Sequence, residues 1–84
     1  MEITYHPRFE RRYRKMSLEA KNEAELKEKI FRKNPFDTRL KAHKLKGKLK
    51  NHWSFSVTSR CRILFIFQKE DVIFLDIGDH KIYQ

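Results

Sequence analysis

The first third of the chain has apolar residues at helical spacing. Phe9, Tyr13 and Met16 recur every three or four positions among charged residues, which predicts an amphipathic helix over residues 7–16. The proline at its start suits the first helical position, because that position needs no amide donor. Ahead of this helix, residues 3–5 form a short apolar alternation that predicts an edge or terminal strand.

A second helix is predicted over residues 18–33. Ser17 can act as its N-cap by accepting a hydrogen bond from an exposed amide, and the Asn-Pro pair at 34–35 ends it. The face that is expected to be buried is marked by Leu26 and Ile30, together with Ala20 and Phe31. The two helices are therefore expected to form a hairpin.

The last third of the chain has the patterns of three strands. Residues 52–58 alternate between apolar and small polar side chains, residues 61–68 are apolar on both faces after their start, and residues 72–77 complete the run. The Lys-Glu-Asp segment at 69–71 supplies a hairpin turn. The middle strand suits the centre of a sheet, because both of its faces would be buried.

The order strand, helix, helix and three strands predicts an α+β domain, in which the helical hairpin covers one face of a twisted, mainly antiparallel sheet. The other face is expected to stay open. Residues 1–84 are expected to form a single domain, because 84 residues leave no room for a second.

The basic net charge of the chain indicates which class of partner it attracts. Lys and Arg number 20 against 11 Asp and Glu, which gives a formal net charge of +9. Such a field attracts polyanions or an acidic protein partner. The cations concentrate in residues 39–50, where Leu40, Leu45 and Leu49 are expected to anchor a loop or short strand to the body.

Several other classes of protein are disfavoured. The single Cys61 cannot form an internal disulfide, and the histidines show no zinc-ligand spacing, so neither a metal nor another cofactor is expected. With glycine only at positions 47 and 78, neither a nucleophile elbow nor a phosphate-binding loop can be built. No apolar run approaches a membrane span and the start lacks a signal-peptide pattern, so a cytoplasmic location without membrane contact is expected.

The histidines and cations suit chemistry on a phosphate. Cleavage of RNA through its 2′-hydroxyl needs a base, cations around the phosphate and an acid for the leaving 5′-oxygen. His43 and His80 fall beside the basic segment and after the last strand. The cations expected near them are Lys46, Lys48, Arg60 and Arg62. This set is compatible with phosphate chemistry or with simple RNA binding, and composition does not choose between them.

Three motifs connect the chain to a known family. They are Leu-x-Gly at 45–47, Arg-Ile-Leu-Phe at 62–65 and a terminal His-x-x-Tyr at 80–83. In these segments the chain resembles the RelE/ParE superfamily of bacterial toxins, most closely its YafQ-like and YoeB-like members. The early strand and helical hairpin also match, so the resemblance covers nearly the whole chain.

The resemblance implies the toxin of a type II toxin-antitoxin system, an endoribonuclease that cuts mRNA in the ribosomal A site without a metal. It also implies its partners: the ribosome and mRNA, and an acidic, partly disordered antitoxin that forms a hetero-oligomer with the toxin. By the same resemblance, His43 would be the base, Arg62 would steady the scissile phosphate and His80 would be the acid. Tyr83 would orient or stack on a substrate base. The residues expected to bind RNA backbone are Lys46, Lys48, Lys50 and Arg60.

Ser54 and Ser56 depart from the family pattern. RelE-like members have lysines at these positions, and YafQ-like members have a histidine at the second, so slower cleavage would follow. Two alternatives stay open: a ParE-like toxin that inhibits DNA gyrase without cutting RNA, and an inactive module that binds RNA or a partner. A nuclease would lose activity on mutation of His43 or His80, whereas a gyrase inhibitor would tolerate both changes.

Overall fold

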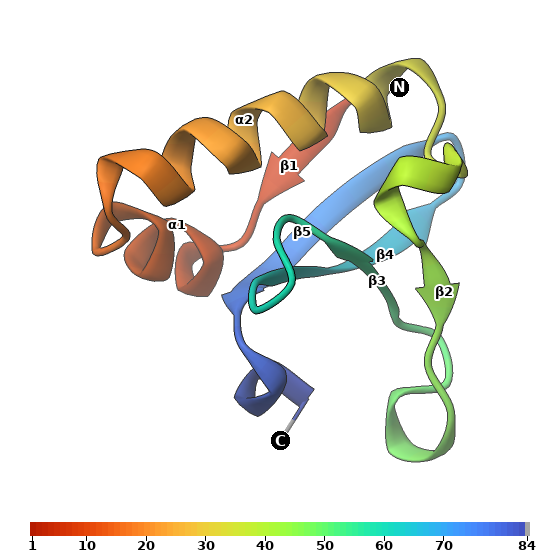
Figure 1. The fold of residues 1–84 in the computed structure, drawn as a ribbon. Helices are drawn as coiled ribbons and strands as arrows, with labels where there is room; N and C mark the ends of the chain where they lie inside the picture. The colour runs from red at the N-terminus through yellow and green to blue at the C-terminus, as the bar shows by residue number, and fades with distance from the viewer. Residues whose placement is uncertain (84) are drawn as a thin grey trace.

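The computed structural model describes residues 1–83, with Lys48 described by its backbone only. Five strands form one open sheet in the order β1-β5-β4-β3-β2, and two helices lie over one of its faces (Figure 1). The elements in chain order are β1 (Ile3–Tyr5), α1 (Pro7–Arg14), α2 (Leu18–Lys33), β2 (His43–Lys44), β3 (Trp53–Ser56), β4 (Arg62–Gln68) and β5 (Asp71–Gly78). The predicted α+β architecture is confirmed.

The sheet is mixed but mainly antiparallel. β1 runs parallel to β5, and the three remaining pairings are antiparallel. β4 lies at the centre, as the double-sided apolar pattern predicted, and β1 is an edge strand. The other edge is β2, a strand of two residues inside the basic segment that was expected to be a loop or a short strand.

Three short 3-10 turns complete the chain: η1 (Thr38–Leu40), η2 (Gly47–Leu49) and η3 (His80–Tyr83). Leu40, with no exposed surface, anchors η1 in the core, and Ile82, at 5% exposure, anchors η3. η2 and η3 both project from the side of the sheet opposite α2 (Figure 1). They therefore frame the face that the helices leave uncovered.

The predicted helix signals act as expected at the two N-termini. Pro7 occupies the start of α1, where the His6 side chain accepts a hydrogen bond from the Arg8 amide at 3.0 Å. Ser17 caps α2 by accepting from the Ala20 amide at 3.1 Å. The first helix ends at residue 14, two residues earlier than predicted, because the chain turns there into the cap of α2.

A cluster of four phenylalanines joins α2 to the sheet. The ring centroid of Phe31 lies 5.0 Å from those of Phe55 and Phe65 and 5.4 Å from that of Phe74, and all four side chains are fully buried. Each such aromatic pair contributes roughly 0.5–1.5 kcal/mol beyond the burial of its area. Phe31 therefore fixes which face of α2 meets the sheet.

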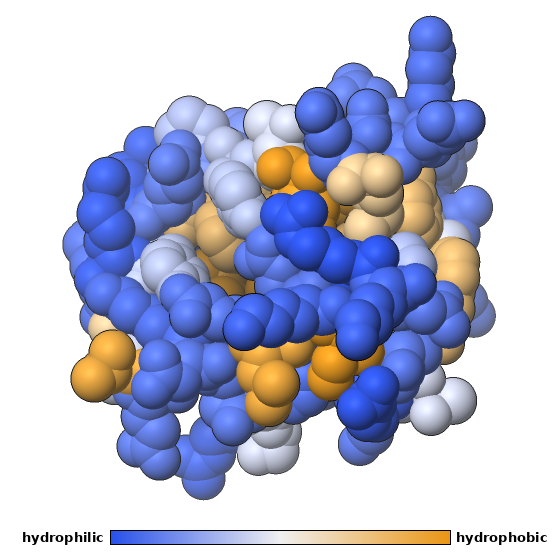
Figure 2. All heavy atoms as spheres, turned by 90° about the horizontal axis from the view of Figure 1, so that it is seen from above, coloured by the Kyte–Doolittle hydropathy of each residue, from blue (hydrophilic) through white to orange (hydrophobic). Residues whose placement is uncertain are grey.

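The expectation that Leu26 is buried is wrong. Leu26 is 52% exposed, whereas Ala24 is buried at 3% exposure and Ile30 is half-buried. Ala24 and Phe31 lie seven residues apart on one stripe of the helix, and docking of that stripe turns Leu26 outward. The helical face is otherwise mostly hydrophilic, with apolar side chains in small separate patches (Figure 2). Within residues 1–83, no helix combines the length and apolar character needed to cross a membrane.

Candidate functional site

The uncovered face of the sheet carries several of the predicted site residues. Phe55 points into the core, so its neighbours Ser54 and Ser56 point to the opposite face, because side chains alternate along a strand. His43 is the cross-strand partner of Ser54, and Arg62 is the partner of Ser56. Directly paired residues share a face, so His43 and Arg62 lie on the same surface as the two serines.

Tyr83 reaches back over this face from η3. Its hydroxyl lies 2.7 Å from the Ser54 hydroxyl, and Ser54 has no exposed surface. The backbone of η3 is held by Ile82, whose side chain is buried and whose amide donates to the Asp79 carbonyl at 3.1 Å. The face expected to stay open is therefore covered at this point.

His80 begins η3 and is exposed. Its ring centroid lies 6.3 Å from that of Tyr83, with the two planes inclined by 39°. The Asp79 carboxylate stabilises the turn by accepting from the Lys81 amide at 2.9 Å. His80 thus stands beside Tyr83 with its imidazole accessible from solvent, which is what a proton donor to a bound substrate requires.

Arg62 is positioned by the serine across the strand pair. Its Nη1 donates to the Ser56 hydroxyl at 3.3 Å, and the side chain is half-buried. A guanidinium has five N–H donors in a fixed planar fork, which suits a phosphate. The bond to Ser56 occupies one donor and holds the fork on the uncovered face.

His43 lies on the edge strand β2 and is exposed. Its Nδ1 lies 3.3 Å from the Lys41 carbonyl. A proton on Nδ1 that donates to this carbonyl leaves Nε2 as an acceptor, which is the tautomer that a general base needs. Lys41 itself has a φ of 53° and turns the chain into β2.

The predicted RNA-binding residues occupy two separate loops. Lys46 and Lys50 flank η2 and are exposed on the loop that projects beyond β2 (Figure 1). Arg60 is exposed in the turn between β3 and β4, where its amide donates to the Thr58 hydroxyl at 3.2 Å. The side chain of Lys48, the fourth predicted residue, lies outside the described part of the structure.

A hollow of about 400 Å³ opens next to Arg62. We call it the cationic hollow; it is lined by Lys27, Arg39, Lys41, Ser56, Val57, Thr58, Ser59 and Arg62. Sequence reasoning missed Lys27, Arg39 and Lys41 as candidate site residues. The position of Arg39 and Lys41 in the basic segment was an available signal, but nothing in the helical spacing of Lys27 indicates that it reaches the sheet.

The candidate site offers groups for proton transfer and anion binding. Among residues 1–83, no three His, Cys, Asp or Glu side chains lie together in a way that could hold a metal ion. The predicted site residues supply two imidazoles, a guanidinium and a phenol, and Ser54 and Ser56 add two hydroxyls. They can move protons and bind an anion.

The family model described as the bacterial toxin of type II toxin-antitoxin systems, YafQ, matches residues 1–83. The chain belongs to the YafQ family. It is thus a toxin of a type II toxin-antitoxin system, and the resemblance seen in the three sequence motifs is confirmed. A search of curated proteins gives no match to this chain.

Solved structures support the same fold for this YafQ-family toxin. A YoeB/ParE toxin from Agrobacterium tumefaciens has a TM-score of 0.80 at 15% identity and covers 95% of this chain and 99% of its own. YafQ from E. coli strain BL21(DE3) has a TM-score of 0.75 at 16% identity, over 98% and 96% of the two chains. A YoeB-YefM complex from Staphylococcus aureus has a TM-score of 0.78 at 17% identity, over 95% and 97%.

Proposed function

We propose that this YafQ-family toxin is an endoribonuclease that cuts mRNA in the ribosomal A site by acid and base catalysis, without a metal. The observation that carries the proposal is the clustering around Ser54. This one residue is paired with His43 across the strands and bonded to Tyr83, while Arg62 stands at the next pair on the same face. A base, an aromatic ring and a phosphate-binding cation therefore adjoin one another.

The chemistry follows from these groups. Nε2 of His43 takes the proton from the 2′-hydroxyl, and the resulting oxygen attacks the adjacent phosphorus to form a 2′,3′-cyclic phosphate. The bond to the 5′-oxygen breaks, and His80 gives that oxygen a proton. Arg62 stabilises the charge that builds on the phosphate, and Tyr83 stacks on a base next to the cut.

The basic surface outside the catalytic residues would bind the RNA of the ribosome and of the message. The net charge of +9 attracts RNA over a range of about 10 Å in ordinary salt. Contacts to RNA backbone are assigned to Lys46, Lys48, Lys50 and Arg60. A toxin that acts on translating ribosomes works in the cytoplasm.

An acidic antitoxin is the proposed protein partner. The similar YoeB from Staphylococcus aureus is found in a complex with YefM, which supports a toxin-antitoxin hetero-oligomer here. Complementary charge would speed the association, because the toxin carries +9. The antitoxin would silence the toxin by covering the face that holds His43 and Arg62.

Primer extension on an mRNA in a reconstituted translation system tests the function. The wild-type toxin is compared with His43→Ala and His80→Ala, each with and without ribosomes. We expect cuts within A-site codons that require ribosomes and disappear in both variants. In cells that express the toxin, halted growth with intact message and unchanged toxicity of both variants would point instead to a protein target such as DNA gyrase. Steeply salt-dependent RNA binding without any cut or toxicity would indicate an inactive binding module.

A further inference from the structure

The cationic hollow collects charge from three parts of the chain. Lys27 comes from α2, Arg39 and Lys41 from the segment around η1, and Arg62 from the start of β4. The hydroxyl groups of Ser56, Thr58 and Ser59 stand among these cations. Its volume of about 400 Å³ falls within the range of small-ligand sites, roughly 300–1,000 Å³.

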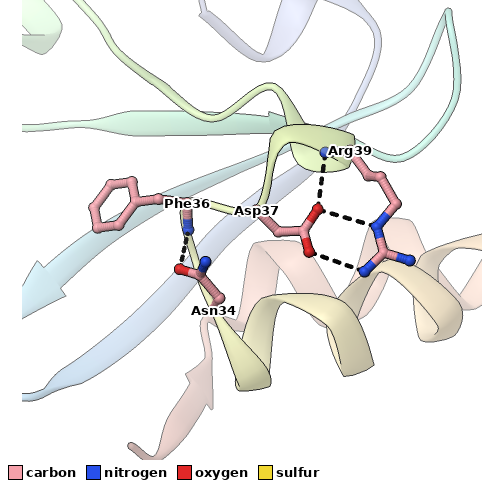
Figure 3. A network of polar contacts seen from close by, with 4 residues as sticks. All are labelled: Asn34, Phe36, Asp37 and Arg39. Carbon is pink, nitrogen blue, oxygen red and sulfur yellow. Dashed lines mark hydrogen bonds and ion pairs between the residues drawn. The ribbon is translucent and has the colours of Figure 1, made fainter.

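Lys27, Arg39 and Arg62 are each held by a hydrogen bond but keep donors for a ligand. Lys27 donates to the Val57 carbonyl at 2.9 Å and lies 3.6 Å from Glu23, and an ammonium has three donors. Arg39 forms a bidentate pair with Asp37 at 3.0 and 2.9 Å (Figure 3), which occupies two of its five donors. The hollow therefore has three positioned cations and the exposed Lys41, with two carboxylates as neighbours.

The ligand that suits this lining is a phosphate. Ammonium and guanidinium donors together with hydroxyls recognise phosphate oxygens, and among the described residues no carboxylate lines the hollow itself. Arg62 is shared between the hollow and the face that carries His43. An anion in the hollow would therefore neighbour the anion at Arg62.

We propose that the cationic hollow binds a backbone phosphodiester of the message, adjacent to the one that is cut. The inference rests on the proposed function in that Arg62 is taken to hold the scissile phosphate. A second bound phosphate would fix the direction in which the RNA strand crosses the sheet. It would also convert a single contact at Arg62 into an oriented pose of the 2′-hydroxyl before His43.

The chain offers matched variants for the test. Lys41→Asn removes a charge from the hollow, and asparagine tolerates the left-handed backbone at a φ of 53°. Lys69→Asn is its control, because Lys69 has a φ of 59° in the turn at the far end of β4. Lys27→Gln removes a second hollow charge from α2, and Lys29→Gln removes a charge from the same helix where it lines a different hollow.

The probe is a fluorescent single-stranded octanucleotide with a 2′-O-methyl group on every residue, which can bind but cannot be cut. Binding of the intact toxin is followed by anisotropy over a range of salt concentrations. The salt slope is the slope of log K against log salt concentration, and we expect each hollow variant to reduce its magnitude by about 0.7. A variant that binds like the wild type at about 1 M salt would then bind about fivefold more weakly than the wild type at about 0.1 M. The two control variants should keep the wild-type slope. Urea unfolding of all four variants reports whether each one is folded.

Three results would overturn the inference. An equal loss in hollow and control variants would mean that only the overall charge matters. No loss in any variant, with binding to vacant ribosomes also unchanged, would mean that the hollow holds no RNA phosphate. Unchanged octanucleotide binding, with weaker binding to vacant ribosomes, would assign the hollow to ribosomal RNA. Because the probe cannot be cut, a failure here leaves the cleavage test intact, and a failure of cleavage leaves this result standing.

Discussion

The hydroxyl groups of Ser54 and Tyr83 lie 2.7 Å apart on the face of the sheet that the helices leave uncovered. Ser54 has no exposed surface, and a buried hydroxyl without a partner costs about 1–3 kcal/mol. The two residues are 29 positions apart in the chain, so the bond ties the C-terminal turn to the middle of the sheet. A residue that departs from the family pattern therefore supports the aromatic ring of the proposed site.

We expect Ser54→Ala and Tyr83→Phe to slow cleavage by a similar amount, about 2- to 10-fold, because each removes one end of the same hydrogen bond. The double variant should be no slower than either single variant, whereas Tyr83→Ala should be slower still because it removes the ring. Single-turnover cleavage on programmed ribosomes measures these rates. Additive effects of the two single changes would show that the hydroxyls act independently.

Gly78→Ala should disturb the site through η3. A Cβ at Gly78 would lie 3.0 Å from Cγ2 of Ile82, and the backbone φ of +158° is one that side chains disfavour. We expect a loss of about 1–3 kcal/mol in the free energy of unfolding and a drop in cleavage, because His80 and Tyr83 move with Ile82. Urea unfolding and cleavage rates measure the two effects.

Gly47→Ala is the control for this change. Gly47 also has a positive φ, 72°, but a Cβ there meets nothing within 4 Å. It should cost about 1–2 kcal/mol of backbone strain in the η2 loop without moving η3. Equal losses of cleavage in the two glycine variants would argue against a role for the contact between Gly78 and Ile82.

Stability at acid pH should depend on Asp37. Hydrogen bonds from the side chain and then the backbone amide of Arg39 lower the pKa of Asp37 to about 2. A carboxyl with a lowered pKa stabilises the fold above its unfolded value near 3.8, and that contribution is lost as the pH falls toward 2. The urea midpoint of Asp37→Asn should therefore fall less than that of the wild type between about pH 5 and pH 2.5. Arg39→Gln should share part of this behaviour, and identical profiles in all three proteins would contradict the assignment.

Cys61 should react slowly with iodoacetamide in the folded protein. Burial raises the pKa of its thiol, the charge of Asp79 raises it further, and a backbone hydrogen bond with Gly78 opposes them. Because the thiolate is the nucleophile, alkylation at about pH 8 should be slow in the native state and should speed up in urea. Equal rates in the two states would show that Cys61 is freely accessible.

Local signals in the sequence predicted most of the fold. Pro7 and Ser17 act at the helix starts where they were placed, because capping depends on neighbouring residues alone. The apolar run at 61–68 became the central strand, because only a strand with both faces buried accommodates it. The alternation of apolar and small polar residues over 52–58 predicted that Ser54 and Ser56 lie on the face opposite the core.

Contacts between distant segments were beyond the sequence. The two-residue strand β2 exists through its pairing with β3, and it has no alternation of its own. Lys27 reaches the Val57 carbonyl because docking of Phe31 sets the rotation of α2, which the helical pattern leaves open. The same rotation exposes Leu26. The bond between Ser54 and Tyr83 likewise depends on where η3 packs, which no local pattern around the serines indicates.

In the cleavage proposed for this toxin, the nucleophile is the 2′-hydroxyl of the message itself. The most direct measurement compares two ribosome-bound messages that differ only in a single 2′-deoxynucleotide immediately 5′ to the cut. We predict that the all-ribose message is cut to a 2′,3′-cyclic phosphate and a 5′-hydroxyl, with His43→Ala slower by about 100-fold or more, and that the deoxy message stays intact at that position. Equal cleavage of both messages would contradict the account.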